Sequence, residues 1–224
     1  FNKVKKEIYF ATYLANLANY DAIDIAFDLE LVQQVKEAIN NSNMQLKEDF
    51  NISHIDPLIV VSLETSSFAE SKNDDFEFSI NKLNNFDIDI LEFHIDYFNT
   101  DFFLEKMKII KESFIGKIIS FRISRKNLSN ANIIELIKTA KSILKNNLII
   151  EVDGIDDFNE DNFNQTLQTI STADIIHKEL NSKIPNIKRI PILLCGGTNS
   201  YTFRLAKQCN VPFSGISLNL NYLN

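Results

Sequence analysis

Several side chains suited to catalysis or binding lie inside short apolar runs of this sequence. Asp24, Glu92 and Glu151 are flanked by aliphatic residues, and His94 and Arg122 have similar neighbours. Carboxyl groups held close together raise the pKa of at least one of them, which is how a general acid is made. A histidine shuttles protons near neutral pH, and an arginine can clamp a carboxylate or phosphate through two hydrogen bonds. Asp24, Glu92, His94 and Glu151 are therefore candidate catalytic residues, and Arg122 is a candidate ligand-binding residue.

These residues belong to a regular series of apolar runs bounded by polar turns. The length and β-branched content of the runs predict strands. Apolar residues between the runs recur at spacings of three and four, which predicts helices. The expected strands are 22–27, 58–63, 88–95, 117–123, 148–152, 190–195 and 211–218, and the expected helices contain 4–18, 31–39, 76–85, 103–110, 133–144, 167–180 and 203–206.

Strands that alternate with helices predict βαβ units and a parallel sheet. Seven strands, each preceded by a helix, are one strand short of a (β/α)8 barrel. We therefore expect an α/β protein with a TIM-type (β/α)8 barrel that lacks strand 1 and the last helix in this chain. Residues 1–224 would form a single domain. The alternative is an open, doubly wound sheet.

Side chains along the expected strands alternate between an apolar and a polar set. The apolar set should face the helices, because both surfaces of a parallel sheet are covered. The polar set should then face the barrel interior, near the strand ends where active sites of this fold lie. It comprises Asp24, Asp28, Ser62, Glu64, Glu92, His94, Asp96, Ser120, Arg122, Ser124, Glu151 and Asp153. Three interpretations stay open: a buried network in which Arg122 neutralises Glu92 or Glu151, an acid–base site, and ligand anchoring without catalysis.

The segment after the sixth expected strand reads Gly196-Gly197-Thr198-Asn199 and leads into a helix. Two glycines allow an anion to approach the main chain, and Thr198 and Asn199 are good helix caps. This is where such barrels commonly bind phosphate. The turn expected to complete the site, 218–221, contains no glycine, so half of the usual cradle is absent. These four residues are candidate ligand-binding residues, and the alternative is a tight turn that merely needs glycine.

Composition excludes several classes of protein. The net charge of −7 argues against a nucleic-acid binder. Cys195 and Cys209 form no disulfide framework, and the lack of Cys/His clusters argues against zinc and iron–sulfur sites. His94 with Glu92 and Asp96 is a poor metal signal, so we predict no metal site. A membrane-spanning run, a signal peptide, a P-loop, a Rossmann fingerprint and a nucleophile elbow are all missing from the sequence.

Several motifs occur in an order that resembles a known family. They are the segments 20–28, 57–63, 89–94, 196–202 and 213–217, of which Gly-Gly-Thr-Asn and Leu-Glu-Phe-His are the most specific. Together they resemble the LdpA-like family, the light-dependent period proteins of cyanobacteria and related plastid-encoded barrel proteins. The resemblance implies a role in light or redox input to the circadian clock. Family members carry iron–sulfur clusters on a cysteine-rich segment, but here 64–73 contains no cysteine, so a cluster is not supported.

The residues and the resemblance together give one main functional expectation. It is an LdpA-like regulatory or assembly protein of a photosynthetic organism, with a non-catalytic barrel that binds a small anionic ligand and one or more protein partners. No cofactor is expected, and the expected location is the cyanobacterial cytoplasm or the plastid stroma. Two alternatives remain: a TIM-barrel enzyme that binds a phosphate ligand and uses the inward carboxylates, and an accessory subunit of a larger complex.

Overall fold

A parallel sheet of seven strands forms the centre of the molecule. The computed structural model describes residues 2–26, 28–53, 55–63, 73–95, 100–124, 131–153, 162–181, 190–195, 198 and 200–216. The strands lie side by side in chain order, and every neighbouring pair is parallel. They are β1 (Ala22–Ala26), β2 (Leu58–Leu63), β3 (Ile90–His94), β4 (Ile118–Ser124), β5 (Leu148–Asp153), β6 (Ile192–Cys195) and β7 (Gly215–Ile216).

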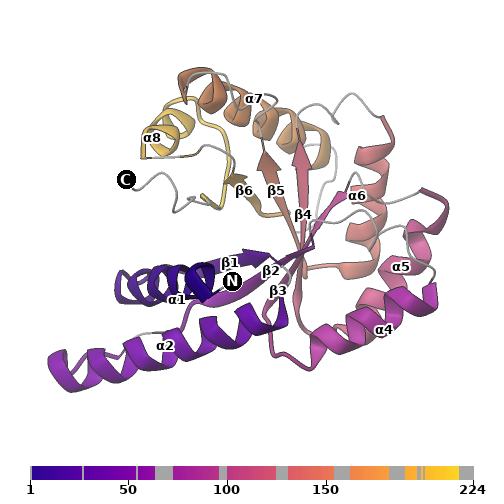
Figure 1. Ribbon diagram of the computed structural model, residues 1–224. Helices are drawn as coiled ribbons and strands as arrows, with labels where there is room; N and C mark the ends of the chain where they lie inside the picture. The colour runs from indigo at the N-terminus through magenta and orange to yellow at the C-terminus, as the bar shows by residue number, and fades with distance from the viewer. Residues whose placement is uncertain are drawn as a thin grey trace.

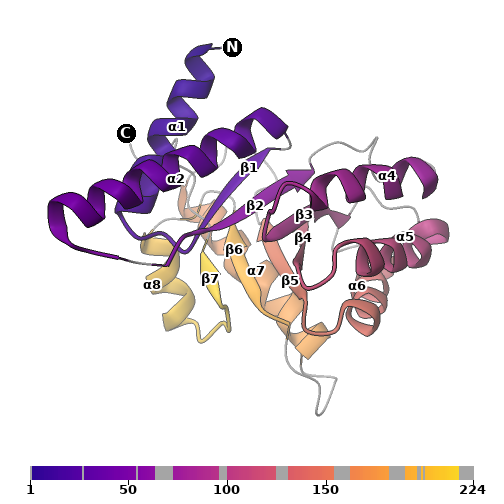
Figure 2. The same ribbon diagram turned by 90° about the horizontal axis from the view of Figure 1, so that it is seen from below.

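Helices alternate with the strands and lie on the outside of the curled sheet (Figures 1 and 2). They are α1 (Asn2–Leu17), α2 (Leu29–Phe50), α4 (Asn73–Asn84), α5 (Thr100–Ser113), α6 (Ala131–Leu144), α7 (Asn162–Asn181) and α8 (Ser200–Gln208). All of the strands and helices expected from the sequence are confirmed. Among the described residues of the last expected strand, only Gly215 and Ile216 pair with β6; residues 211–214 lie outside it, and Pro212 among them has no backbone N–H.

The sheet curls into a half-barrel without closing. Among the described residues, no strand pairs with the outer edge of β1 or of β7. The inner face of β1 is therefore open, and Ala22, Asp24 and Ala26 are exposed while Ile23 and Ile25 on its other face are buried. The fold is an α/β half-barrel that resembles a TIM barrel lacking closure.

Asparagine and other non-glycine residues end most of the helices. Asn19, Asn51, Lys145 and Asn210 follow α1, α2, α6 and α8 with φ values of 58°, 54°, 55° and 54°. Such left-handed residues let the chain leave a helix while its last carbonyls keep hydrogen-bond partners. The backbone N–H of Asn51, for example, donates to the carbonyls of Leu46 and Lys47. After α5 the position is taken by Gly116, at φ 79°.

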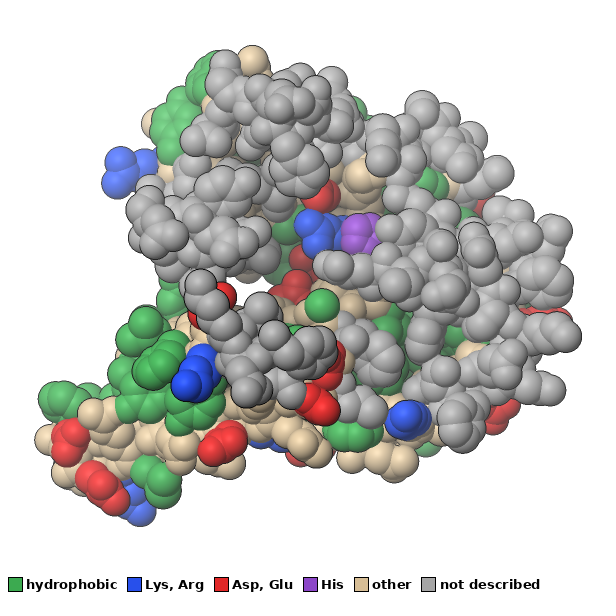
Figure 3. Space-filling model, in the orientation of Figure 1, with side chains coloured by type: hydrophobic (Ala, Val, Ile, Leu, Met, Phe, Trp, Pro, Cys, Tyr) green, Lys and Arg blue, Asp and Glu red, His purple; other side chains and the backbone are tan. Residues whose placement is uncertain are grey.

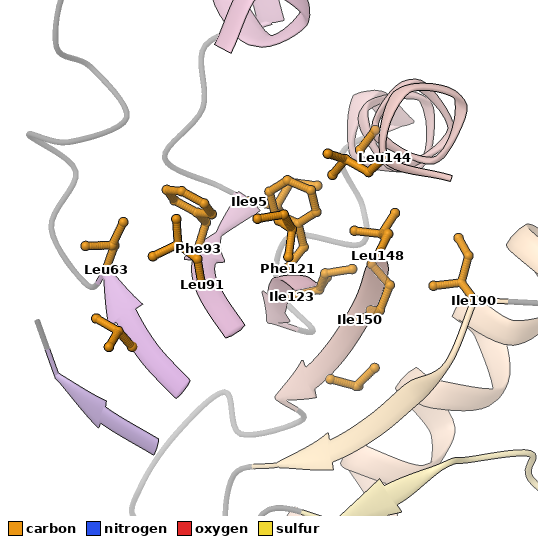
Figure 4. Packing of buried hydrophobic residues seen from close by; sticks show 14 of the residues in the cluster. Leu63, Leu91, Phe93, Ile95, Phe121, Ile123, Leu144, Leu148, Ile150 and Ile190 are labelled. Atoms are coloured by element: carbon orange, nitrogen blue, oxygen red, sulfur yellow. The ribbon is translucent and has the colours of Figure 1, made fainter. Parts of the chain in front are cut away.

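The outer face of the sheet forms the hydrophobic core (Figure 4). Phe93 of β3 and Phe121 of β4 have ring centroids 6.2 Å apart. Helices cover both rings: Phe76 of α4 lies 6.3 Å from Phe93, and Phe103 of α5 lies 5.9 Å from Phe121. This aromatic cluster fixes the centre of the sheet and therefore the positions of the inward side chains between these residues. None of the described helices carries an apolar stretch long enough to cross a membrane.

Candidate functional site

The inner face of the sheet carries the polar set, as the strand alternation predicts. The register places Ser62 beside Glu92, Glu92 beside Ser120, and Arg122 between His94 and Glu151. Acidic, basic and histidine side chains gather near the middle of the molecule in Figure 3. The four candidate catalytic residues and Arg122 thus come together from β1, β3, β4 and β5, on one face and toward the carboxyl ends of the strands.

Ser62 links two of the candidate carboxyl groups. Its hydroxyl lies 2.6 Å from Asp24 Oδ1 and 2.9 Å from Glu92 Oε1, and the residue is buried. Asp24 is exposed on the open face of β1, whereas Glu92 is fully buried. The hydroxyl of Ser62 therefore connects a carboxyl group at the protein surface with one in the interior.

Glu92 and Glu151 form a second contact deeper in the same layer. Burial, the charge of Glu151 and a side-chain hydrogen bond with Glu151 raise the pKa of Glu92 well above its usual value, and Arg122 only partly offsets them. Ser120 Oγ donates to Glu151 Oε1 over 3.2 Å. Both glutamates and both serines are buried. Because a buried carboxylate beside another is costly, the neutral form of Glu92 is favoured more strongly than that of an exposed glutamate.

Arg122 supplies the positive charge of this layer. Its Nη2 donates to Asp153 Oδ2 over 2.9 Å, and its Nη1 lies 3.8 Å from Glu92 Oε1. Burial alone would lower the pKa of Arg122, but Cys195, Glu92 and Asp153 outweigh it and raise the pKa, so the guanidinium stays charged. The side chain is 23% exposed, and its Nε has no hydrogen-bond partner in the described part of the chain.

The end of β6 reaches the same layer. Cys195 pairs in register with Asp153 and is close enough to Arg122 for an electrostatic interaction. Burial raises the pKa of its thiol well above the usual value, so Cys195 is neutral. The sequence places Cys195 at the end of the sixth expected strand and gives it no metal or disulfide role; the alternation of the inward set, continued into β6, would have found its place in this layer.

Thr198 is the only described residue of the predicted Gly196–Asn199 ligand loop. It is 5% exposed and precedes the first turn of α8, which begins at Ser200. Gly196, Gly197 and Asn199 lie outside the described residues, as do Glu64 and Asp96 of the polar set. In the sequence, this loop follows Cys195, the last residue of β6, and precedes Ser200, the first residue of α8.

Asp28 does not face the barrel interior, contrary to the sequence-based expectation. It is the N-cap of α2, and its Oδ1 accepts from the N–H groups of Glu30 and Leu31 over 2.8 and 3.4 Å. The strand ends at Ala26, so the alternation does not extend this far. An aspartate two residues past a strand serves the following helix instead.

Neither a metal-binding cluster nor a cavity is found at this site among the described residues. Within the described ranges, no cluster of three or more His, Cys, Asp or Glu side chains is arranged to hold a metal ion. Two cavities, of about 310 and 240 Å³, lie elsewhere: one beside Lys141 and Leu180, the other beside His177 and Pro212. Both include Ile190, which precedes β6, so they lie at the amino end of that strand, away from the inward carboxyl groups.

Comparisons with known proteins concern the fold. No family model and no curated protein matches this chain. Among solved structures it is similar to octameric ribulose-1,5-bisphosphate carboxylase/oxygenase from Pyrococcus horikoshii in complex with sulfate, with 10% sequence identity and a TM-score of 0.55. The match covers 95% of this chain and 48% of the carboxylase chain, so this chain spans about half the length of that protein. That neighbour also contains a TIM barrel, which supports a TIM-like fold here.

Proposed function

We propose that this protein is an LdpA-like regulatory or assembly protein whose half-barrel binds a small anionic ligand between Arg122 and the loop that leads to α8. The observation that carries this proposal is the position of Arg122. Its guanidinium is charged, partly exposed and close enough to Cys195, the last residue of β6, for an electrostatic interaction. Gly196 and Gly197 follow Cys195 in the sequence and precede α8, and we propose that their backbone N–H groups join this charge in holding a phosphate, sulfate or carboxylate group.

The burial of the carboxyl groups favours binding over catalysis by them. Glu92 and Glu151 are 0% and 6% exposed, and Glu92 contacts Ser62 while Glu151 contacts Ser120. A general acid must come within hydrogen-bond reach of its substrate. The alternative, an enzyme that uses these carboxylates on a phosphate ligand, requires Glu92 or Glu151 to become accessible.

Sulfate is a suitable probe for the anion site, because its charge is constant near neutral pH. We expect calorimetry to show saturable binding of sulfate to the wild-type protein, and Arg122→Gln to weaken it at least about tenfold, since charge-assisted hydrogen bonds are lost. Lys178→Gln is the matched control, because it removes a positive charge from the exposed face of α7. Equal sulfate binding by the wild type and Arg122→Gln would refute the proposed site.

An exposed apolar surface favours a second role, as an accessory subunit of a larger complex. Phe10 and Leu14 of α1 are each 62% exposed and lie one helical turn apart, while Thr12, Ala15 and Asn16 on the opposite side are buried. Asn16 donates to the carbonyl of Ile39, which holds this opposite side against α2. Contiguous exposed apolar side chains commonly mark interaction surfaces.

Native mass spectrometry of protein purified from its own cells should show a bound protein partner and a retained small anion without iron. A bare monomer would count against both roles.

The open edges also support a complete eight-stranded barrel. We propose that one further parallel strand pairs with both β7 and β1, and that a further helix covers α1. This arrangement would bury Ala22 and Ala26, which are exposed on the inner face of β1. Hydrogen exchange on protein from its own cells should then show protected β1 amides. Fast exchange along β1 would contradict closure.

A further inference from the structure

The inner layer contains a continuous chain of four polar groups. Two measured contacts join the first three groups, 2.6 Å from Asp24 to Ser62 and 2.9 Å from Ser62 to Glu92, and the charge of Glu151 acts on Glu92 at the inner end. Asp24 is exposed, and the other three residues are buried. The chain therefore runs from the solvent into the centre of the sheet.

Counting the protons in this chain shows that the carboxyl groups are not all ionised. A hydroxyl group has one proton, so Ser62 can donate to Asp24 or to Glu92 but not to both. The other contact needs a carboxyl group that donates. Glu151 adds a negative charge that disfavours the ionised form of Glu92. The arrangement thus holds at least one proton that three ionised carboxylates would not have.

The protonation of this chain sets the charge around Arg122. The titratable and charged groups facing Glu92 are Asp24 from β1, His94 from β3, Arg122 from β4, Glu151 and Asp153 from β5, and Cys195 from β6. With Glu92 protonated, Asp153 is the close anion that offsets the guanidinium. When Glu92 ionises, a second negative charge appears 3.8 Å from Arg122 Nη1 and opposes any incoming anion.

We propose that anion binding at Arg122 is coupled to proton uptake by the Asp24–Ser62–Glu92–Glu151 chain, so that the ligand binds more tightly as the pH falls. This inference rests on the proposed anion site and adds its regulation. A bound anion favours the protonated form of these four polar groups. As the pH rises, the protein with bound anion therefore keeps a proton that the free protein loses. The ligand affinity then changes by up to about tenfold per pH unit over the range in which the chain titrates.

The test is sulfate calorimetry across about pH 5.5 to 8.5, in buffers of different ionisation enthalpy, which counts the protons taken up per sulfate bound. We expect up to about one proton for the wild type. Glu92→Gln, which keeps a neutral group of the same shape, should take up almost none and should bind sulfate with nearly constant affinity. Ser62→Ala, which cuts the chain, should also reduce the uptake if Glu92→Gln fails to fold.

Two further variants distinguish proton uptake by the Asp24–Ser62–Glu92–Glu151 groups from proton uptake by other titrating groups. Glu135→Gln removes an exposed carboxylate that pairs with Lys138 on α6, and it should behave like the wild type. His94→Gln should keep the proton uptake; if uptake vanishes there and persists in Glu92→Gln, the histidine is the coupled group and the inference is overturned. Binding of sulfate without any pH dependence also overturns it but leaves the anion site intact. Binding that does not require Arg122 overturns both.

Discussion

The two faces of the central sheet differ although they are built from alternate residues of the same strands. The outer face places Phe93, Phe121 and Ile150 against the helices, and all three are at most 2% exposed. The inner face places Glu92 and Glu151 in an equally buried layer, where hydrogen bonds and ion pairs replace apolar contacts. Apolar burial stabilises without direction, whereas buried polar groups contribute only when each finds its partner. The apolar packing of the outer face therefore stabilises the fold. The inner face buries polar and charged groups at a cost in free energy, and these groups are the candidates for a function.

The largest expected effect tests the outer face. Phe121→Ala removes a ring that contacts both Phe93 and Phe103, and should lower the free energy of unfolding by about 3–5 kcal/mol, since it leaves a cavity in the core. Chemical denaturation followed by circular dichroism measures this loss. A loss below about 1 kcal/mol would show that the aromatic cluster does not hold the sheet.

A smaller effect is expected on the inner face. Arg122→Met leaves Asp153 without its 2.9 Å partner, and should cost about 1–3 kcal/mol, less than a fully buried ion pair because both side chains are about one fifth exposed. The same denaturation experiment applies. If Arg122→Met destabilises more than Phe121→Ala, the division of roles between the two faces is wrong.

The pH dependence of stability sharpens the comparison further. The pKa of Glu92 is raised in the folded protein, so the folded state binds more protons than the unfolded chain. This contribution to stability is complete below the pKa that Glu92 has in the unfolded protein. It is lost as the pH rises through the pKa that Glu92 has in the folded protein. Glu92→Gln should therefore gain stability relative to the wild type as the pH rises above the pKa of Glu92 in the unfolded protein. Melting temperatures across the pH range test this, with Glu135→Gln as the control; identical pH profiles would contradict it.

The smallest effect is expected at the surface. Asp87 lies 3.5 Å from both Lys36 and Lys117, which lower the pKa of its carboxyl group, but its side chain is 83% exposed. Asp87→Asn keeps a residue that tolerates its φ of 51° and should change the free energy of unfolding by less than about 0.5 kcal/mol. The small loss should occur only above the lowered pKa and should shrink in high salt. A change comparable to that of Arg122→Met would mean that surface charge contributes as much as the inner layer.

The strand alternation made most of the inner layer predictable. Inward and outward residues were separable because strand side chains have a period of two, and the polar residues broke otherwise apolar runs. The contacts were not predictable: nothing in the spacing shows that Ser62 lies between Asp24 and Glu92, since this depends on the relative register of three strands. The role of Asp28 was missed because the strand ends two residues earlier, and the place of Cys195 was missed because the inward alternation was not continued into the sixth strand.

The residue types at the left-handed positions after the helices are those that A- and T-rich codons encode. Glycine is the least strained residue at such positions, yet the chain has only five glycines, and Asn19, Asn51, Lys145 and Asn210 take these places instead. Glycine codons begin with two guanines, while asparagine and lysine codons begin with two adenines. A coding bias toward A and T would thus favour asparagine and lysine where the backbone turns, and introducing glycine at Lys145 is a route to greater stability that leaves the inner layer unchanged.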